Sequence, residues 1–138
     1  MSVTVSVSSR AKWVATSVKV LPGDELSFQS IGIWIDAVIP CSADGYDGAW
    51  LYALDRPPRI NDNGRYFRLM GRIITGDIEP QSDNPDETFV IGKHGQYRAA
   101  WGGSLFVFVN DRDGYYWNNW GSIRLTIEHV GRSPMEIN

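Results

Sequence analysis

The chain has 138 residues, 43% of them hydrophobic, which suits one domain with a sizeable core. Its net charge of -3 argues against nucleic acid as a partner, because such binding requires clustered positive charge. No apolar run approaches the ~20 residues of a membrane span, and the single cysteine, Cys41, excludes an internal disulfide. Residues 1–6 lack the basic segment of a secretory signal. We therefore expect one domain over residues 1–138 with a loose tail from about residue 131, either cytoplasmic or exported by a non-classical route.

The first third of the chain is predicted to form strands, because apolar residues recur at every second position. Val3, Val5 and Val7 define the first strand, and residues 13–20, 26–30 and 31–39 define the next three. Residues 21–24, Leu-Pro-Gly-Asp, have the composition of a turn. Trp13 and Trp34 lie inside these strands, and we expect both to pack in the core.

Strands and long loops alternate over the rest of the chain. Residues 67–74 and 89–91 are predicted strands, whereas the proline-bearing segments 55–64 and 77–87 are predicted loops. Residues 104–109, Ser-Leu-Phe-Val-Phe-Val, are typical of a strand buried on both faces. Residues 122–130 alternate, with Ile123, Leu125 and Ile127 on the buried side. No segment has a helical period, so the sequence predicts an all-β fold, a single-domain β-sandwich or jelly roll.

The loop over residues 110–121 concentrates polar and aromatic side chains. Its sequence is Asn-Asp-Arg-Asp-Gly-Tyr-Tyr-Trp-Asn-Asn-Trp-Gly. Ca²⁺ prefers about six to eight oxygen ligands, and Asp111, Asn118 and Asn119 offer side-chain oxygens, with a backbone carbonyl near Tyr115. The segment is not an EF-hand, because Tyr115 and Ser122 stand at positions where that motif needs ligands. The alternative is a solvated loop whose Asn and Asp side chains cap turns.

Several short segments also stand in an order that is found in one lectin family. They are residues 21–28 (Leu-Pro-Gly-Asp-Glu-Leu-Ser-Phe), 69–73 (Leu-Met-Gly-Arg-Ile), 89–92 (Phe-Val-Ile-Gly) and 103–127. Residues 103–127 contain, in this order, a strand, Asn-Asp, an aromatic residue followed by Asn-Asn, Gly-Ser and an alternating strand. In these features the chain resembles the PA-IL-like family, the calcium-dependent galactose-binding bacterial lectins and their relatives.

The resemblance implies a galactose-binding-domain-like β-sandwich that holds two vicinal hydroxyls of a pyranose through a bound Ca²⁺. By this resemblance Asp111, Asn118 and Asn119 are side-chain ligands of the metal, and Tyr115 is a backbone-carbonyl ligand. A further ligand falls near residue 36, where the carboxylate of Asp36 also contributes. Individual sites of this kind are weak, so we expect a homo-oligomer that presents several copies.

The predicted carbohydrate-binding residues come from the same loop and from exposed aromatic positions. They are Asp111, Arg112, Tyr115, Asn118, Trp117 and Trp50, with Tyr46 as a further possible stacking platform. The family's sugar-contacting His and Gln have no counterpart, because residues 43–63 contain neither. The expected ligand is therefore a galactose-like or another pyranose.

The alternatives belong to other classes of protein. An enzyme is not expected, because no zinc-binding spacing, nucleophile elbow or well-placed carboxylate pair is recognisable. A structural or interaction domain, for instance in a phage or secretion-associated assembly, stays open. In that case Ca²⁺ would only stabilise the loop.

Overall fold

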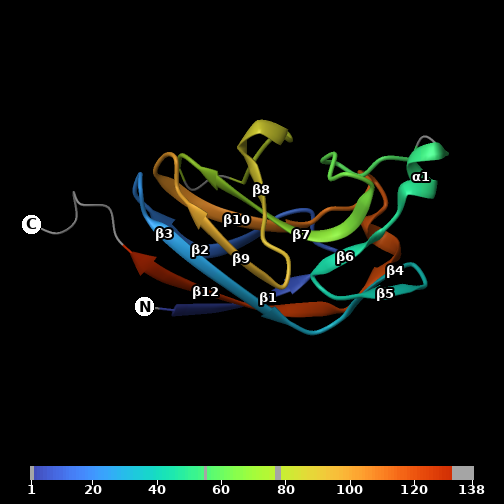
Figure 1. Cartoon of the computed structure of the whole chain (residues 1–138), viewed down its shortest axis with the longest axis horizontal. Helices are drawn as coiled ribbons and strands as arrows, with labels where there is room; N and C mark the ends of the chain where they lie inside the picture. Colours follow the sequence, from blue (N-terminus) through green and yellow to red (C-terminus); the bar gives the residue numbers. More distant parts are fainter. Residues whose placement is uncertain (1, 55, 77–78, 132–138) are drawn as a thin grey trace, which may run out of the picture.

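The structure, a computed structural model, describes residues 2–54, 56–76 and 79–131, without the side chains of Tyr52 and Ala53. It consists of two facing antiparallel sheets and a small third sheet at one end (Figure 1). Gly131 closes the last strand, and the rest of the predicted tail, residues 132–138, lies outside the described residues. No helix in the described part of the chain has the length and apolarity needed to cross a membrane.

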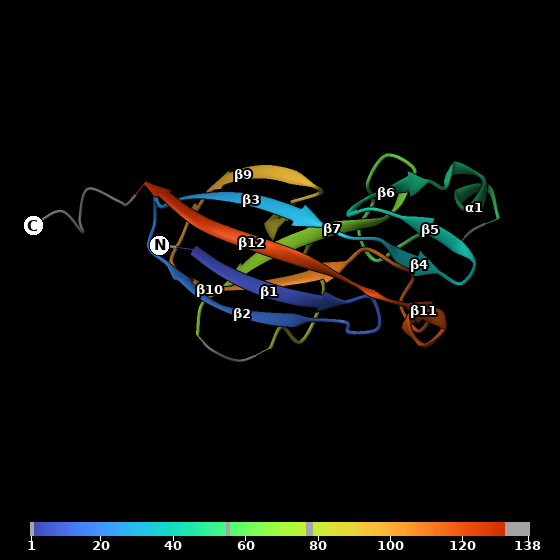
Figure 2. The same ribbon diagram turned by 90° about the horizontal axis from the view of Figure 1, so that it is seen from below.

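The first sheet contains four strands in the order β1-β12-β3-β9 (Figure 2). These strands are β1 (Ser2–Ser8), β12 (Ser122–Gly131), β3 (Glu25–Ile31) and β9 (His94–Arg98). The alternation predicted for residues 122–130 is confirmed, because Ile123, Leu125 and Ile127 are all buried.

The second sheet contains five strands in the order β2-β10-β7-β6, with β8 paired to β7. They are β2 (Val14–Val20), β10 (Gly103–Val109), β7 (Arg65–Ile74), β6 (Asp44–Asp47) and β8 (Thr88–Val90). The predicted strands at 13–20, 67–74, 89–91 and 104–109 are therefore confirmed, with small shifts at their ends.

The hydrophobic core lies between the two sheets. Leu26, Phe28 and Leu125 from the first sheet join Leu69, Leu105 and Val107 from the second in one cluster of buried side chains. Trp34 is fully buried in the same cluster, as expected, whereas Trp13 is only half-buried. Two sheets that share one core define a β-sandwich, so the predicted fold class is confirmed.

Strand β10 is buried on both of its faces, as its apolar sequence predicts. Leu105, Val107 and Val109 face the main core, while Phe108 packs in a second cluster with Ile60 and Met70. Trp13 covers this second cluster, with its ring centroid 4.8 Å from that of Phe108. The loop that follows β10 therefore starts from a strand that is fixed on both sides.

The predicted strand over residues 31–39 is wrong in its extent. The structure has two short strands, β4 (Trp34–Asp36) and β5 (Ile39–Cys41), joined by a tight turn in which Ala37 has a φ of 57°. They form the third sheet together with β11 (Asn119–Trp120), in the order β11-β4-β5. A left-handed residue other than glycine or asparagine gives no turn signal in the sequence, which explains the error.

Five further elements were missed by the pattern of apolar residues. They are β6, β9, the short helix α1 (Ala49–Ala53) and the 3-10 turns Pro85–Glu87 and Tyr116–Asn118. Helix α1 has five residues, too few for a helical period to show in a sequence. Figure 1 shows α1, β4, β5 and β6 gathered at one end of the sandwich.

Truncation of a core side chain in β12 should destabilise the domain strongly. Leu125 is fully buried between β1 and β3, so Leu125→Ala should lower the free energy of unfolding by about 2–5 kcal/mol. Denaturant titration would measure this change. Val130→Ala, at an exposed position in the same strand, is the control and should change it by less than about 0.5 kcal/mol. Equal effects of the two substitutions would contradict the assignment of the core.

Candidate functional site

A cleft of about 280 Å³ opens where the third sheet, α1 and the loop 110–121 meet. One part of its lining is polar and includes Asp36, Asp111 and Asn118. Another part is apolar and comes from Val38 in the β4–β5 turn and from Trp50 and Leu51 in α1. The cleft therefore has oxygen-bearing side chains on one side and an apolar wall beside them.

Strand pairing brings Asp36 to the loop 110–121. In the register of β11 and β4, Asn119 stands opposite Asp36, and Trp120 stands opposite Ile35. The chain then turns at Gly121, whose φ is 85° and whose Cβ, if it had one, would lie 3.3 Å from the carbonyl oxygen of Ile33. Only glycine combines that conformation with so close an approach, so Gly121 permits the pairing.

The carboxylate of Asp111 is held inside the protein, with 4% of the residue exposed. It accepts hydrogen bonds from Asn119 Nδ2 at 2.9 Å and from the backbone N–H of Arg112 at 2.7 Å. Asp36 accepts a hydrogen bond of 2.5 Å from the Tyr46 hydroxyl. Within the described part of the chain, neither Asp36 nor Asp111 forms an ion pair, so two carboxylates share the cleft without a salt-bridge partner.

The electrostatics of this pair follow from burial and from like charge. The pKa of Asp111 is raised to about 7 by burial and, second, by the negative charge of Asp36, against the hydrogen bonds from Asn119 and Arg112. Burial also raises the pKa of Asp36, against the hydrogen bond from Tyr46. Both carboxylates would be more stable beside a cation.

Two amide oxygens in the same loop are buried without a partner. Oδ1 of Asn118 and Oδ1 of Asn119 are inaccessible to solvent and accept no hydrogen bond from any described residue. Asn119 uses its Nδ2 for Asp111 and for the Ser9 carbonyl at 2.8 Å, which leaves its oxygen as the free end. An unsatisfied buried acceptor costs about 1–3 kcal/mol, so a pair of them calls for an explanation.

These residues fit a hard cation. Carboxylate, amide and carbonyl oxygens are the ligands that Ca²⁺ prefers, and such an ion would satisfy unpartnered acceptors beside carboxylates that have no ion-pair partner. Among the described residues no group of three His, Cys, Asp or Glu side chains could hold a metal. The candidate set has two carboxylates, two amides and backbone carbonyls, so a calcium ion in it would depend on neutral oxygens as well.

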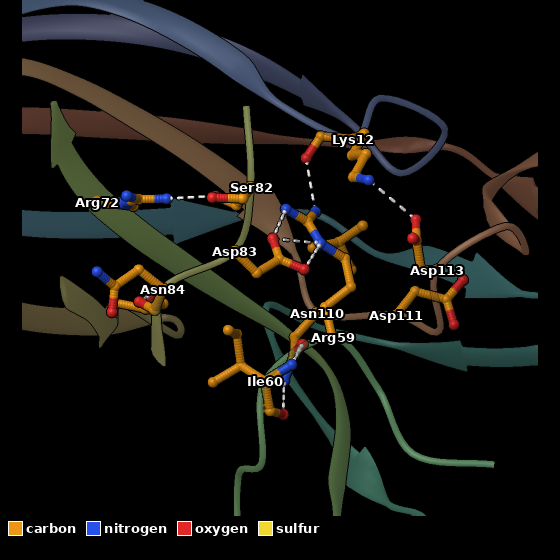
Figure 3. A network of polar contacts seen from close by, with 12 residues as sticks. Lys12, Arg59, Ile60, Arg72, Ser82, Asp83, Asn84, Asn110, Asp111 and Asp113 are labelled. Carbon is orange, nitrogen blue, oxygen red and sulfur yellow. Dashed lines mark hydrogen bonds and ion pairs between the residues drawn. The ribbon is translucent and has the colours of Figure 1, made fainter. Parts of the chain in front are cut away.

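The root of the loop is anchored by a buried arginine. The Arg59 side chain is fully buried and contacts Asp83, with Nη2 2.6 Å from Oδ1, and the Lys12 carbonyl at 2.8 Å (Figure 3). Its guanidinium lies over the rings of Trp13 and Phe108, 4.5 and 4.2 Å from their centroids. The backbone N–H of Arg59 donates to the Asp111 carbonyl at 2.9 Å. Arg59 thus ties the segments 56–60, 79–87 and 110–111 together.

Two further side chains fix residues 109–111. The amide of Asn110 pairs with the backbone of Ile60, accepting from its N–H at 3.0 Å and donating to its carbonyl at 2.9 Å. The Tyr116 hydroxyl donates to the Val109 carbonyl at 2.5 Å and accepts from Arg59 Nη1 at 2.9 Å. In Figure 3 the Asp111 carboxylate points away from Arg59. This network therefore orients Asp111 without neutralising it.

The structure brings most of the predicted site residues together. Asp36, Asp111, Arg112, Tyr115, Asn118 and Trp50 all line the cleft. Asn119 is fully buried beside Asp111 and does not line it. Trp117 is also outside the lining, with 68% of the residue exposed and its carbonyl bound by Arg10 Nη2. That these predicted site residues contact a metal or a sugar remains a prediction.

Several other residues of the cleft were not predicted from the sequence, and one, Tyr46, was predicted with a different role. Val38, Leu51, Arg56 and Tyr66 line the cleft, and Tyr46, named as a possible stacking platform, binds Asp36 instead. These residues come from separate segments that the topology assembles. No spacing in the sequence could have indicated them.

Comparisons with known proteins give the fold. The sequence matches no protein-family model and no curated protein. Among solved structures the chain is similar to one described as "EclA N-terminal domain; PllA-like lectin", with 16% identity and a TM-score of 0.62 over 92% of this chain and 95% of that one. A functionally unknown conserved protein mutant from Bacillus anthracis str. Ames has 11% identity and a TM-score of 0.46 over 93% of this chain and 21% of that one. The chain therefore shares the fold of a lectin domain, which agrees with the predicted sandwich.

The raised pKa of Asp111 predicts how pH changes the stability of the metal-free protein. The folded pKa of about 7 lies above the ordinary value of 3.8, so between these pH values the folded chain holds a proton that the unfolded chain has lost. Stability should therefore fall as pH rises from 4 to 7. In EDTA, Asp111→Asn should exceed wild type in melting temperature by a few degrees at pH 8 and match it near pH 4. A constant difference across this range would contradict the burial of the charge.

Loss of the Tyr116 hydroxyl should loosen the root of the loop. Tyr116→Phe removes one of the two hydrogen bonds to the buried Val109 carbonyl and leaves one Arg59 N–H without its acceptor, which should lower the free energy of unfolding by about 1–3 kcal/mol. The matched control is Tyr115→Phe, because the Tyr115 side chain is exposed, and it should change stability by less than about 0.5 kcal/mol. Denaturant unfolding of both variants measures the difference, and equal values would refute the anchoring role.

Proposed function

We propose that the protein is a non-catalytic, lectin-like module that binds a pyranose through Ca²⁺ held at the edge of the cleft. One observation carries the proposal. Asp36 and Asp111 form no ion pair with any described residue, and the adjoining Asn118 and Asn119 oxygens accept no hydrogen bond there. The shared fold with a solved lectin domain supports the same class of function.

Each residue of the set would have a defined task. Asp36, Asp111, Asn118 and Asn119 would hold the ion with their side chains, and Tyr115 with its backbone carbonyl. The bound ion would supply a direct contact to two vicinal hydroxyls of the sugar. Such a contact matters because neutral hydrogen bonds to a sugar replace bonds to water and gain little.

The apolar wall would bind the rest of the sugar ring. Trp50 is 55% exposed, and Val38 is exposed in the turn beside it, so both offer apolar surface to a ligand in the cleft. The C–H face of a pyranose is apolar and packs against such a surface. The ion would thus set the orientation of the hydroxyls while the wall adds contact area.

Thermal unfolding tests the proposal. The melting temperature should rise by several degrees on addition of Ca²⁺ to EDTA-treated protein, and again with the correct sugar, since a ligand at 100 times its Kd adds about 2.7 kcal/mol. Asp111→Ala should abolish both shifts. Asp113→Ala is the matched control, because Asp113 lies in the same loop but is exposed and pairs with Lys12 at 3.0 Å, and it should keep both.

Two results would count against the proposal in different ways. Absence of a calcium shift in the wild-type protein would refute the ion site. A calcium shift with no sugar response across a broad glycan array would favour a structural or interaction domain, in which the ion only stabilises the loop.

A further inference from the structure

Two arginines line the same cleft as the two aspartates. Arg56 comes from the segment after α1, and Arg112 comes from the loop after β10. The backbone of Arg56 is held at the cleft, since its N–H donates to the Leu51 carbonyl at 3.0 Å and its carbonyl accepts from the Tyr66 hydroxyl. Two positive charges from separate parts of the chain therefore meet at one place.

The fold does not use these two guanidinium groups as it uses six of the other arginines. Within the described residues, neither Arg56 nor Arg112 has a side-chain hydrogen bond or an ion pair. The side chains that do bind a carboxylate or a backbone carbonyl are those of Arg10, Arg59, Arg65, Arg68, Arg72 and Arg98. The Arg112 guanidinium lies over the Tyr115 ring, with Cζ 4.5 Å from the centroid, and this contact with the ring uses none of its N–H donors.

The charges of the cleft favour an anion. A divalent cation would balance Asp36 and Asp111, so the charges of Arg56 and Arg112 would stay uncompensated. A neutral ligand would cover these guanidinium groups without offering a counter-charge, which is unfavourable. The planar fork of a guanidinium matches a carboxylate or a sulfate with two parallel hydrogen bonds.

We propose that the preferred ligand is an acidic saccharide, a pyranose whose carboxylate or sulfate group is bound by Arg56 and Arg112 while its vicinal hydroxyls reach the ion. This inference rests on the proposed function and specifies its substrate class. It predicts recognition by charge as well as by hydroxyl geometry.

Calorimetric titration of the calcium-saturated protein tests the inference with matched ligands. The probes are methyl galactoside, methyl galacturonide, the methyl ester of that galacturonide and a 6-O-sulfated methyl galactoside, with the gluco series in parallel. At least one acidic sugar should bind about 10-fold more tightly than its neutral counterpart, as expected for a charge-assisted pair. The preference should fall when NaCl rises from 50 to 500 mM. The carboxylate and sulfate arms identify which anion is recognised.

Substitution of the two arginines tests whether they, rather than the bound Ca²⁺, bind the carboxylate or sulfate group of the sugar. In Arg56→Gln and Arg112→Gln the ratio of acidic to neutral affinity should fall towards one. Arg124→Gln, which removes an exposed arginine outside the cleft, is the control and should keep the ratio. A ratio that is unchanged in both cleft variants would overturn the inference.

The outcomes distinguish this inference from the proposed function. Equal binding of neutral and acidic sugars in the presence of Ca²⁺ would overturn the preference and leave the lectin-like function intact. Absence of binding by every probe in calcium would overturn the inference together with the saccharide function.

Discussion

The structure depends at its functional end on two carboxylates that share a partly dehydrated cleft and form no ion pair with any described residue. Burial and mutual repulsion disfavour the ionised forms of Asp36 and Asp111, and the hydrogen bonds to them offset only part of this cost. The nearby Asn118 and Asn119 oxygens add two buried acceptors without donors. A site of this kind is unfavourable for folding on its own, so the rest of the domain must provide the stability that keeps it in place.

That stability comes from the strand on which the loop begins. Strand β10 is buried on both faces, and Arg59 and Tyr116 bind the backbone of residues 109–111 directly where the strand ends. The tip of the loop, around Asp113, is exposed and contributes no core contact. The loop is thus rigid where it carries Asp111 and tolerant where it faces solvent, which allows one short segment to combine an unfavourable site with a stable fold.

The sequence predicts those features of the fold and the cleft that arise from residues close together in the chain, and it does not predict contacts between remote segments. Strands β1, β3, β10 and β12 are evident because their apolar period is local, and Asp111, Asn118 and Asn119 are evident because they crowd into one loop. The β4–β5 hairpin was missed because Ala37 adopts a left-handed conformation with no sequence signal. The contacts of Asp36 with Tyr46, and the approach of Arg56 to the cleft, arise from the pairing of remote segments, and no local pattern encodes them.

The division of the cleft between segments has a consequence for specificity. The candidate ion ligands come from β4 and the loop 110–121, whereas Trp50, Leu51 and Arg56 come from α1 and the residues after it. Among the described residues, the side chains of the second group form no hydrogen bond or ion pair with the buried network around Arg59 and Asn110, so substitutions there would leave the polar contacts of that network in place. Under the proposed function, the ion ligands would hold the hydroxyls of the sugar, and Trp50, Leu51 and Arg56 would determine which sugar is accepted. Under the same proposal, the lack of His and Gln in residues 43–63, together with Arg56 at the cleft, would correspond to a different ligand.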